Sequence, residues 1–94
     1  MPRPRLNRYI GFRYKDIYYK PQGIPMRLLK EVELKVDEVE ALRLKHLQQL
    51  NQTEASKQMK VSRATYQRAL QSAYKKITFA IIKGQAIKIS KKHE

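Results

Sequence analysis

Polar side chains that can recognise a nucleic-acid base recur at helical spacing in the second half of the chain. The guanidinium of arginine and the amide of glutamine can each form two hydrogen bonds to one base edge, on guanine and adenine respectively. At about 100° per residue, such side chains fall on one side of a helix that begins after Ser62. The residues that we expect to face a DNA major groove are Arg63, Gln67, Arg68 and Gln71.

Hydroxyl and ammonium groups around this set suit contacts with phosphate. Thr53, Ser62 and Thr65 occur where helices are predicted to begin, and a hydroxyl there can donate to a phosphate at the helix N-terminus. Lys75 and Lys76 lie further along the predicted helix and should add salt-dependent affinity.

The stretch that must position these side chains has the pattern of one long helix, residues 62–83. Ser62 is a good N-cap, and Gly84 is a natural stop. No acidic residue occurs from Ser62 to Lys83. The apolar residues repeat with the helical period and predict one buried stripe formed by Tyr66, Ala69, Leu70, Ala73, Ile77, Ala80 and Ile81. The far end of this helix, with Phe79 and Ile82, should pack on the N-terminal strands or on a second subunit.

Two shorter helices are predicted before the long one, at residues 37–49 and 53–59. The second follows Asn51, which forms a capping-box pattern with Glu54, and Lys60 and Val61 would make the tight turn after it. The first opens with acidic residues at its positive end. Its apolar side is predicted to consist of Val39, Leu42, Leu47 and Leu50.

We expect one small domain, residues 1–94, with shorter segments on both sides of the helices. Residues 1–8 form a basic arm, residues 9–36 short strands and a loop, residues 37–83 the helices, and residues 84–94 a strand and a tail. Ile87 and Ile89 should point inward from that strand. Residues 32–36 alternate as in a strand, whereas residues 27–30 fit either an extended segment or a helical turn.

Two N-terminal features have a binding interpretation and a plainer one. Arg3 and Arg5, spaced by prolines, could form an extended arm in a minor groove, or a solvated terminus. The tyrosines of residues 9–19 could stack on bases, but packing on the helical core is the interpretation that we favour.

The net charge of +13 is unevenly distributed. Residues 1–35 have nine basic and three acidic side chains, residues 36–61 four of each, and residues 62–94 eight and one. The first two predicted helices are therefore neutral, while the long helix and both flanks are basic. This distribution is typical of a protein with selected surfaces that meet phosphate.

The sequence contains no pattern that predicts catalysis or a bound metal or cofactor. There is no cysteine, and the serines lack a positioned histidine partner. His46 is expected half-exposed on the first predicted helix, and His93 in a tail. We therefore expect no enzyme, no metal and no cofactor. The chain shows no signal peptide and no apolar run that could cross a membrane, so we expect a cytoplasmic, nucleoid-associated protein.

Three segments resemble the helix-turn-helix of sigma-70 region 4. They are Asp37-Glu38-Val39-Glu40-Ala41-Leu42-Arg43-Leu44, Gln52-Thr53-Glu54-Ala55 and Val61-Ser62-Arg63-Ala64-Thr65-Tyr66-Gln67-Arg68. One departure is Lys60, where this motif usually has glycine. A lysine with positive φ there would cost roughly 1 kcal/mol.

Nearly the whole chain resembles uncharacterised protein family 0251, also called domain of unknown function 134, whose members are predicted DNA-binding proteins. The matching segments outside the helices are Arg3-Pro4-Arg5, Tyr19-Lys20-Pro21-Gln22-Gly23-Ile24-Pro25 and Gly84-Gln85-Ala86-Ile87-Lys88-Ile89. The predicted fold class is mainly α, a helix-turn-helix three-helix core with a long last helix. Short β-strands come from the N-terminal region and the C-terminus.

The expected function is sequence-specific binding to duplex DNA, in a transcriptional regulator. Two alternatives remain at this point. The first is RNA binding, which the charge and tyrosines allow. The second is an interaction with RNA polymerase, which the resemblance to sigma-70 region 4 implies. Most such DNA readers are homodimers, because one module gives limited affinity.

Overall fold

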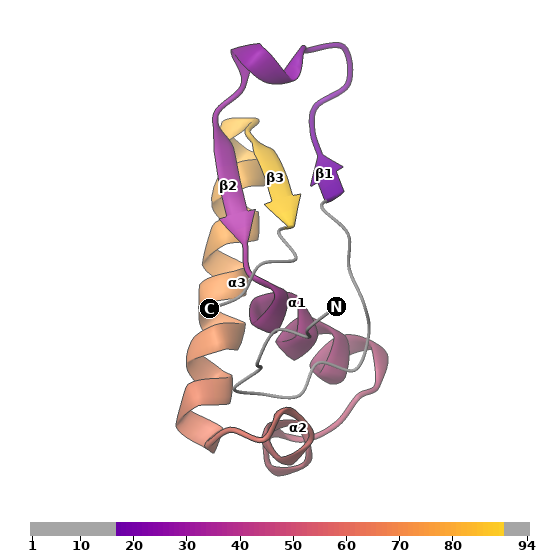
Figure 1. The fold of residues 1–94 in the computed structure, drawn as a ribbon, viewed down its shortest axis with the longest axis vertical. Coiled ribbons are helices and arrows are strands. Elements are labelled where there is room, and N and C mark those ends of the chain that lie inside the picture. The colour runs from indigo at the N-terminus through magenta and orange to yellow at the C-terminus, as the bar shows by residue number, and fades with distance from the viewer. Residues whose placement is uncertain (1–16, 90–94) are drawn as a thin grey trace, which may run out of the picture.

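The computed structural model describes residues 17–89 of the chain. Three helices and three short strands make up most of this part, and the last helix is by far the longest (Figure 1). The predicted fold class, mainly α with short strands from both ends, is therefore confirmed. In chain order the elements are β1 (Ile17–Tyr19), a 3₁₀ turn η1 (Met26–Leu28), β2 (Glu31–Leu34), α1 (Val36–Leu42), a π-helical turn η2 (Arg43–Leu47), α2 (Gln52–Met59), α3 (Arg63–Lys83) and β3 (Ala86–Ile89).

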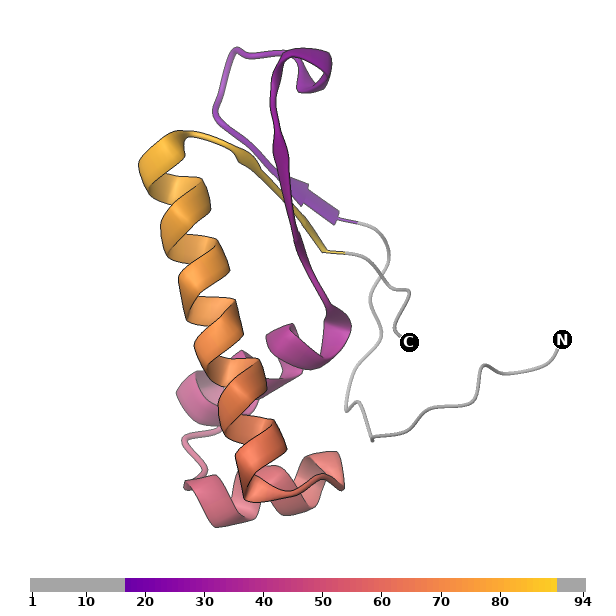
Figure 2. The same cartoon turned by 90° about the vertical axis from the view of Figure 1, so that its left-hand side faces the viewer.

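The strands form one sheet in the order β1-β3-β2, with β3 antiparallel to β1 and parallel to β2. Ile89 of β3 is paired with Ile17 on one side and with Leu34 on the other. These side chains lie beside α3, which runs along one face of the sheet (Figure 2). The predicted closing strand is thus confirmed. The alternating pattern of residues 32–36 is a strand only as far as Leu34, because Val36 already begins α1.

Two hydrophobic clusters hold α3 in place. The first joins α1, η2, α2 and the N-terminal half of α3 and is formed by Ala41, Leu44, Ala55, Met59, Tyr66 and Leu70. The second joins α3 to the sheet and is formed by Leu34, Ala73 and Ile89, with Ile77 and Ile87 packed against it. Ala55 and Ala73 have no exposed surface, so small side chains let the elements approach α3 closely. α3 is therefore anchored along one side over both of its halves.

The helix ends have the caps that the sequence predicts. The amide of Glu54 donates to Oδ1 of Asn51 at 2.8 Å, and the amide of Asn51 donates to Oε1 of Glu54 at 3.0 Å. The amide of Thr65 donates to Oγ of Ser62 at 3.0 Å. Lys60 between these helices has φ 61° and ψ 43°, the left-handed conformation that glycine would adopt without strain. The turn geometry expected from a glycine position is thus kept with a lysine.

Two predicted core positions are wrong. Leu47 is 76% exposed, whereas Leu44 is buried. The cause is the π-helical turn at Arg43–Leu47, whose wider hydrogen-bond spacing shifts the side chains away from the regular helical period. Ile81 is 68% exposed because the chain turns back at Gly84 and β3 leaves only the Ala80 side of α3 buried.

The structure also decides the alternative left open at residues 27–30. Met26–Leu28 is a 3₁₀ turn, and the amide of Leu29 donates to the carbonyl of Met26. The segment before β2 is therefore a helical turn rather than an extended one.

Candidate nucleic-acid interface

The short helix α2 lies across the first turns of α3, and the turn between them is only a few residues long (Figure 2). Ser56, which is 3% exposed, is one of the small side chains at this crossing. The buried side of α3 faces α1 and α2, so its opposite side is open to solvent. This open side is where most of the predicted recognition residues lie.

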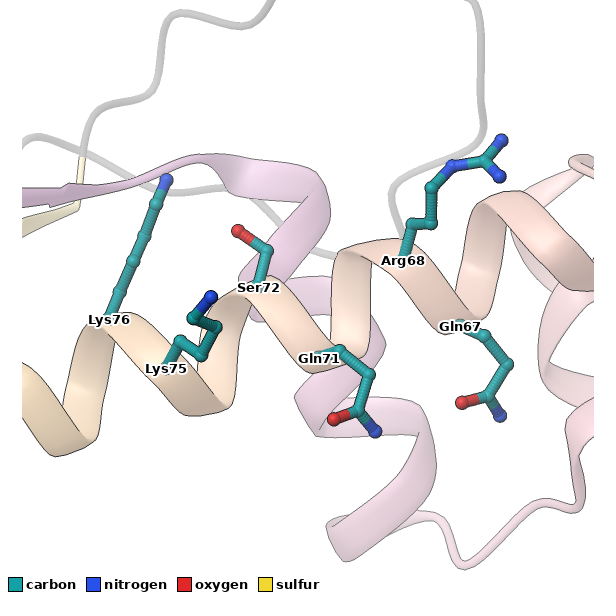
Figure 3. A pocket seen from close by; sticks show the side chains of 6 residues that line it. All are labelled: Gln67, Arg68, Gln71, Ser72, Lys75 and Lys76. Atoms are coloured by element: carbon teal, nitrogen blue, oxygen red, sulfur yellow. The ribbon is translucent and has the colours of Figure 1, made fainter.

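A shallow, open hollow runs along the exposed side of α3. It is lined by Gln67, Arg68, Gln71, Ser72, Lys75 and Lys76, which are all neutral or basic (Figure 3). Gln67 and Gln71 point to one side of the helix, whereas Arg68, Ser72 and Lys76 point to the other (Figure 3). The fold therefore brings four of the predicted residues, Gln67, Arg68, Gln71 and Lys75, onto one surface.

The remaining predicted residues of the described part lie around the beginnings of the two helices. Arg63 is the first residue of α3, Thr53 lies in the first turn of α2, and both are exposed. Oγ of Ser62 donates to Oγ1 of Thr65 at 3.0 Å while accepting from the Thr65 amide. Ser62 thus uses its hydroxyl hydrogen inside the cap, and Thr65 keeps its own hydroxyl hydrogen for another acceptor.

Lys76, which the sequence predicts to add salt-dependent affinity, is held in an ion pair on this surface. Its ammonium donates to Oε1 of Glu38 and to the carbonyl of Glu33, both at 3.0 Å. Oγ of Ser72 donates to the other oxygen of Glu38 at 2.5 Å. The sequence pattern predicts for Glu38 only a place at the helix start, where it does accept from the amide of Lys35. Its second role depends on α3 lying beside α1, which no local pattern reveals.

Gln52 is a further residue of this surface that sequence analysis did not select. It is the first residue of α2, and its Oε1 accepts from Nε2 of Gln67 at 3.1 Å. The contact joins the start of α2 to the polar side of α3. The only sequence signal was its place directly after the N-cap Asn51, which does not by itself indicate a contact with α3.

Only part of the N-terminal region lies among the described residues 17–89. Arg3 and Arg5 lie outside the described residues, as does most of the tyrosine-rich stretch. Tyr18 and Tyr19 are described, and they are 45% and 59% exposed, so the expected packing on the core is wrong for both. In the edge strand β1, Ile17 packs on the second cluster and Tyr18 lies on the opposite face of the sheet. Tyr19 is on the same face as Ile17 but does not pack against that cluster. Nζ of Lys88 lies 5.9 Å from the centre of the Tyr18 ring.

The apolar far end of α3 is only partly covered. Ile77 packs on the sheet as expected, but Phe79 is 50% exposed and Ile82 is 75% exposed. Together with Tyr74, Lys75, Thr78 and Lys83 they line a second shallow hollow. The exposed side of α3 therefore changes from polar in its first half to apolar in its second.

Residues 17–89 contain neither a candidate metal site nor a candidate membrane span. In this part of the chain no three His, Asp or Glu side chains come together in a way that could hold a metal ion. Likewise, none of the helices between Ile17 and Ile89 combines the length and the apolar character needed to cross a bilayer.

Comparison with known proteins gives a family but no activity. The sequence profile of the family described as "Protein of unknown function DUF134" matches residues 1–93. A UPF0251 protein of Dehalococcoides mccartyi is 52% identical over 89 residues, which are 95% of this chain and 76% of that protein. A UPF0251 protein of Clostridium botulinum strain 657 is 45% identical over 93 residues, 99% of this chain but only 59% of the relative. This chain is thus clearly shorter than its Clostridium relatives. No solved structure matches it.

Proposed function

This chain belongs to the DUF134 family, and from its site we propose that it is a sequence-specific duplex DNA-binding protein that regulates transcription. The observation that supports this most strongly is the exposed side of α3, where Gln67, Arg68, Gln71 and Lys75 lie together among neutral or basic neighbours. Glutamine and arginine are the side chains that read adenine and guanine edges in a major groove. The proposal includes no catalytic step and no cofactor, and it implies a cytoplasmic, nucleoid-associated protein.

In this proposal α2, the turn at Lys60 and α3 act as a helix-turn-helix similar to that of sigma-70 region 4. The first turns of α3 enter the major groove, and α2 lies across the DNA backbone. α3 has 21 residues and is therefore about 30 Å long at 1.5 Å per residue. A major groove is about 12 Å wide, so only the N-terminal part of α3 contacts bases. The polar residues of α3 are concentrated in that part.

Contacts with phosphate would come from the helix starts and the basic flanks. Thr53 and Thr65 lie where backbone amides point outward, which favours an anion. Ser62 would have to exchange its bond to Thr65 for a phosphate oxygen. Lys75, Arg3 and Arg5 add affinity through the release of counterions from the DNA, and this contribution falls at higher salt because the release is then less favourable.

The experiment that tests this proposal is selection of bound duplexes from a random DNA library at near-physiological salt. An enriched motif is the expected result, and a palindrome in it would indicate that two copies bind together. Retention without enrichment would mean binding to the backbone alone and would overturn the base contacts of α3. If no duplex is retained, the proposal fails, and structured RNA and RNA polymerase become the partners to test.

A further inference from the structure

Gln52 and Gln67 come from different helices and are hydrogen-bonded to each other on the surface proposed for DNA. Nε2 of Gln67 donates to Oε1 of Gln52 at 3.1 Å, across the crossing of α2 and α3. Both side chains remain partly or fully exposed, so the contact is not forced by burial in the core. A long glutamine side chain loses rotamer freedom when it is held in this way, and the hydrogen bond must offset that entropy cost.

The hydrogen bond determines which groups of Gln67 are left to recognise a base. A glutamine amide has two N–H donors and one carbonyl acceptor. If Gln52 accepts from the N–H on the Cγ side of the Gln67 amide, the other N–H and the carbonyl oxygen remain side by side on its outer edge. Adenine presents an acceptor, N7, beside a donor, the N6 amino group, in the major groove. The free edge of Gln67 is complementary to that pair.

Guanine does not match the same edge. It presents two acceptors, N7 and O6, in the major groove. The carbonyl oxygen of Gln67 would face O6 without a hydrogen between them, which is unfavourable. Discrimination therefore depends on the amide being unable to rotate by 180°, because rotation exchanges its donor and acceptor sides. The Oε1 acceptor of Gln52 opposes that rotation as long as the Gln52 amide keeps its own orientation.

We propose that Gln52 is a positioning residue that holds the Gln67 amide in one orientation, so that Gln67 selects adenine at the position it faces. This inference rests on the proposed function, since it names the base that one residue of the proposed reading helix prefers. It also assigns a role to a residue of α2 that need not touch a base. A merely structural role for Gln52 predicts no change in base preference.

Three variants and one control separate the possibilities. Gln67→Ala removes the base contact, Gln52→Met keeps the side-chain length without the acceptor, and Gln52→Glu keeps an acceptor. Gln58→Met is the matched control, because Gln58 is an exposed glutamine near the other end of the same helix. Each protein is tested by selection from a random duplex library, and its affinity is then measured for the enriched site and for versions changed at one base pair.

The expected result is an adenine preference of about tenfold in the unaltered protein, the size of one bidentate contact, which Gln67→Ala abolishes. Gln52→Met should reduce that preference by about threefold or more, since the amide can then rotate. Gln52→Glu should retain the preference but weaken binding to every duplex, because its negative charge approaches phosphate. Gln58→Met should behave like the unaltered protein.

A measurement without DNA checks the positioning itself. In a ¹H–¹⁵N correlation spectrum of the free protein, the resonance of one of the two Nε2 protons of Gln67 should be shifted downfield by its hydrogen bond. Gln52→Met should remove that shift, and Gln58→Met should not. If the shift is absent in the unaltered protein, Gln52 does not hold the amide and the inference is wrong.

The outcomes distinguish failure of this inference from failure of the proposed function. An unaltered protein that binds duplexes without base preference overturns the proposed function and the inference with it. A Gln67-dependent adenine preference that survives Gln52→Met leaves the proposed function intact and removes the positioning role. A Gln67-dependent preference for another base contradicts the orientation of the amide.

Discussion

The ammonium of Lys76 lies 3.0 Å from Oε1 of Glu38, and this ion pair joins the middle of α3 to the first turn of α1. Glu38 is 5% exposed and also accepts from the hydroxyl of Ser72 and the amide of Lys35. The carboxylate thus has donors from the strand-to-helix junction and from α3. It fixes the position of α3 next to α1 and removes one cation from the exposed polar side of α3.

Replacing Glu38 should therefore destabilise the fold. Glu38→Ala leaves Lys76 with only the Glu33 carbonyl as an acceptor and removes the carboxylate that accepts from the Lys35 amide at the start of α1. We expect a loss of about 2 kcal/mol in the free energy of unfolding, below the range for fully buried pairs because the Lys76 side chain is 30% exposed. Urea denaturation followed by circular dichroism measures this. Glu33→Ala is the control, since Glu33 contacts Lys76 through its backbone carbonyl, which alanine keeps; equal losses in both variants would contradict the role given to the Glu38 carboxylate.

Lys60 should be a site where glycine stabilises the protein. Its φ of 61° is costly for a residue with a Cβ atom and costs nothing in strain for glycine. Lys60→Gly should raise the free energy of unfolding by about 0.5–1 kcal/mol, since the greater chain entropy of unfolded glycine offsets part of the relieved strain. Lys57→Gly, which removes the same charge from the last turn of α2, should instead cost up to about 1 kcal/mol. Thermal unfolding of both variants gives the comparison, and a loss at Lys60 would show that the turn is not strained.

The hydroxyl of Tyr66 is buried and has no hydrogen-bond partner among residues 17–89. Tyr66→Phe removes this unsatisfied group, so we expect unchanged stability or a gain of up to about 1 kcal/mol. Tyr74→Phe is the contrasting change, because the Tyr74 hydroxyl lies 2.6 Å from Nε2 of His46. It should cost roughly 0.5–1 kcal/mol. Denaturation at neutral pH tests both, and a marked loss in Tyr66→Phe would reveal a partner for that hydroxyl.

Tyr66 should also make stability depend on alkaline pH. Burial raises the pKa of the Tyr66 phenol, and the neighbouring Tyr74 raises it further. The folded state then holds this proton more tightly than the unfolded chain, whose tyrosines titrate near pH 10. Ionisation of Tyr66 therefore leaves the free energy of unfolding unchanged below about pH 10 and lowers it as the pH rises above that value. Stability measured as a function of pH should fall less steeply in Tyr66→Phe, and an unchanged slope would contradict the prediction.

Lys75 should contribute affinity without base selectivity. It is exposed on the polar side of α3. Lys75→Ala should weaken binding to all duplexes to a similar extent and reduce the slope of log affinity against log salt by about one. Lys30→Ala is the matched control, since Lys30 is exposed at the start of β2, far from α2 (Figure 1). A change in base preference in Lys75→Ala would make Lys75 a base contact instead.

The sequence by itself determined the features that depend on neighbouring residues. Ser62 and Asn51 cap their helices through groups only three residues away, so residue type and spacing were sufficient to predict both caps. The helical period likewise placed Tyr66, Leu70 and Ala73 in the core and the glutamines of α3 outside it. The family also followed from the sequence, because its matching segments run along nearly the whole chain.

The tertiary structure decided the features that depend on residues far apart in the chain. The ion pair of Glu38 with Lys76 and the bond of Gln52 with Gln67 exist only because α1 and α2 both pack against α3. The π-helical turn takes Leu47 out of the core, a shift that a regular period cannot show, whereas Leu44 is buried at the regular spacing after Glu40 and Ala41. The strand order β1-β3-β2 was also beyond the sequence pattern, because pairing between distant segments depends on how the whole chain closes.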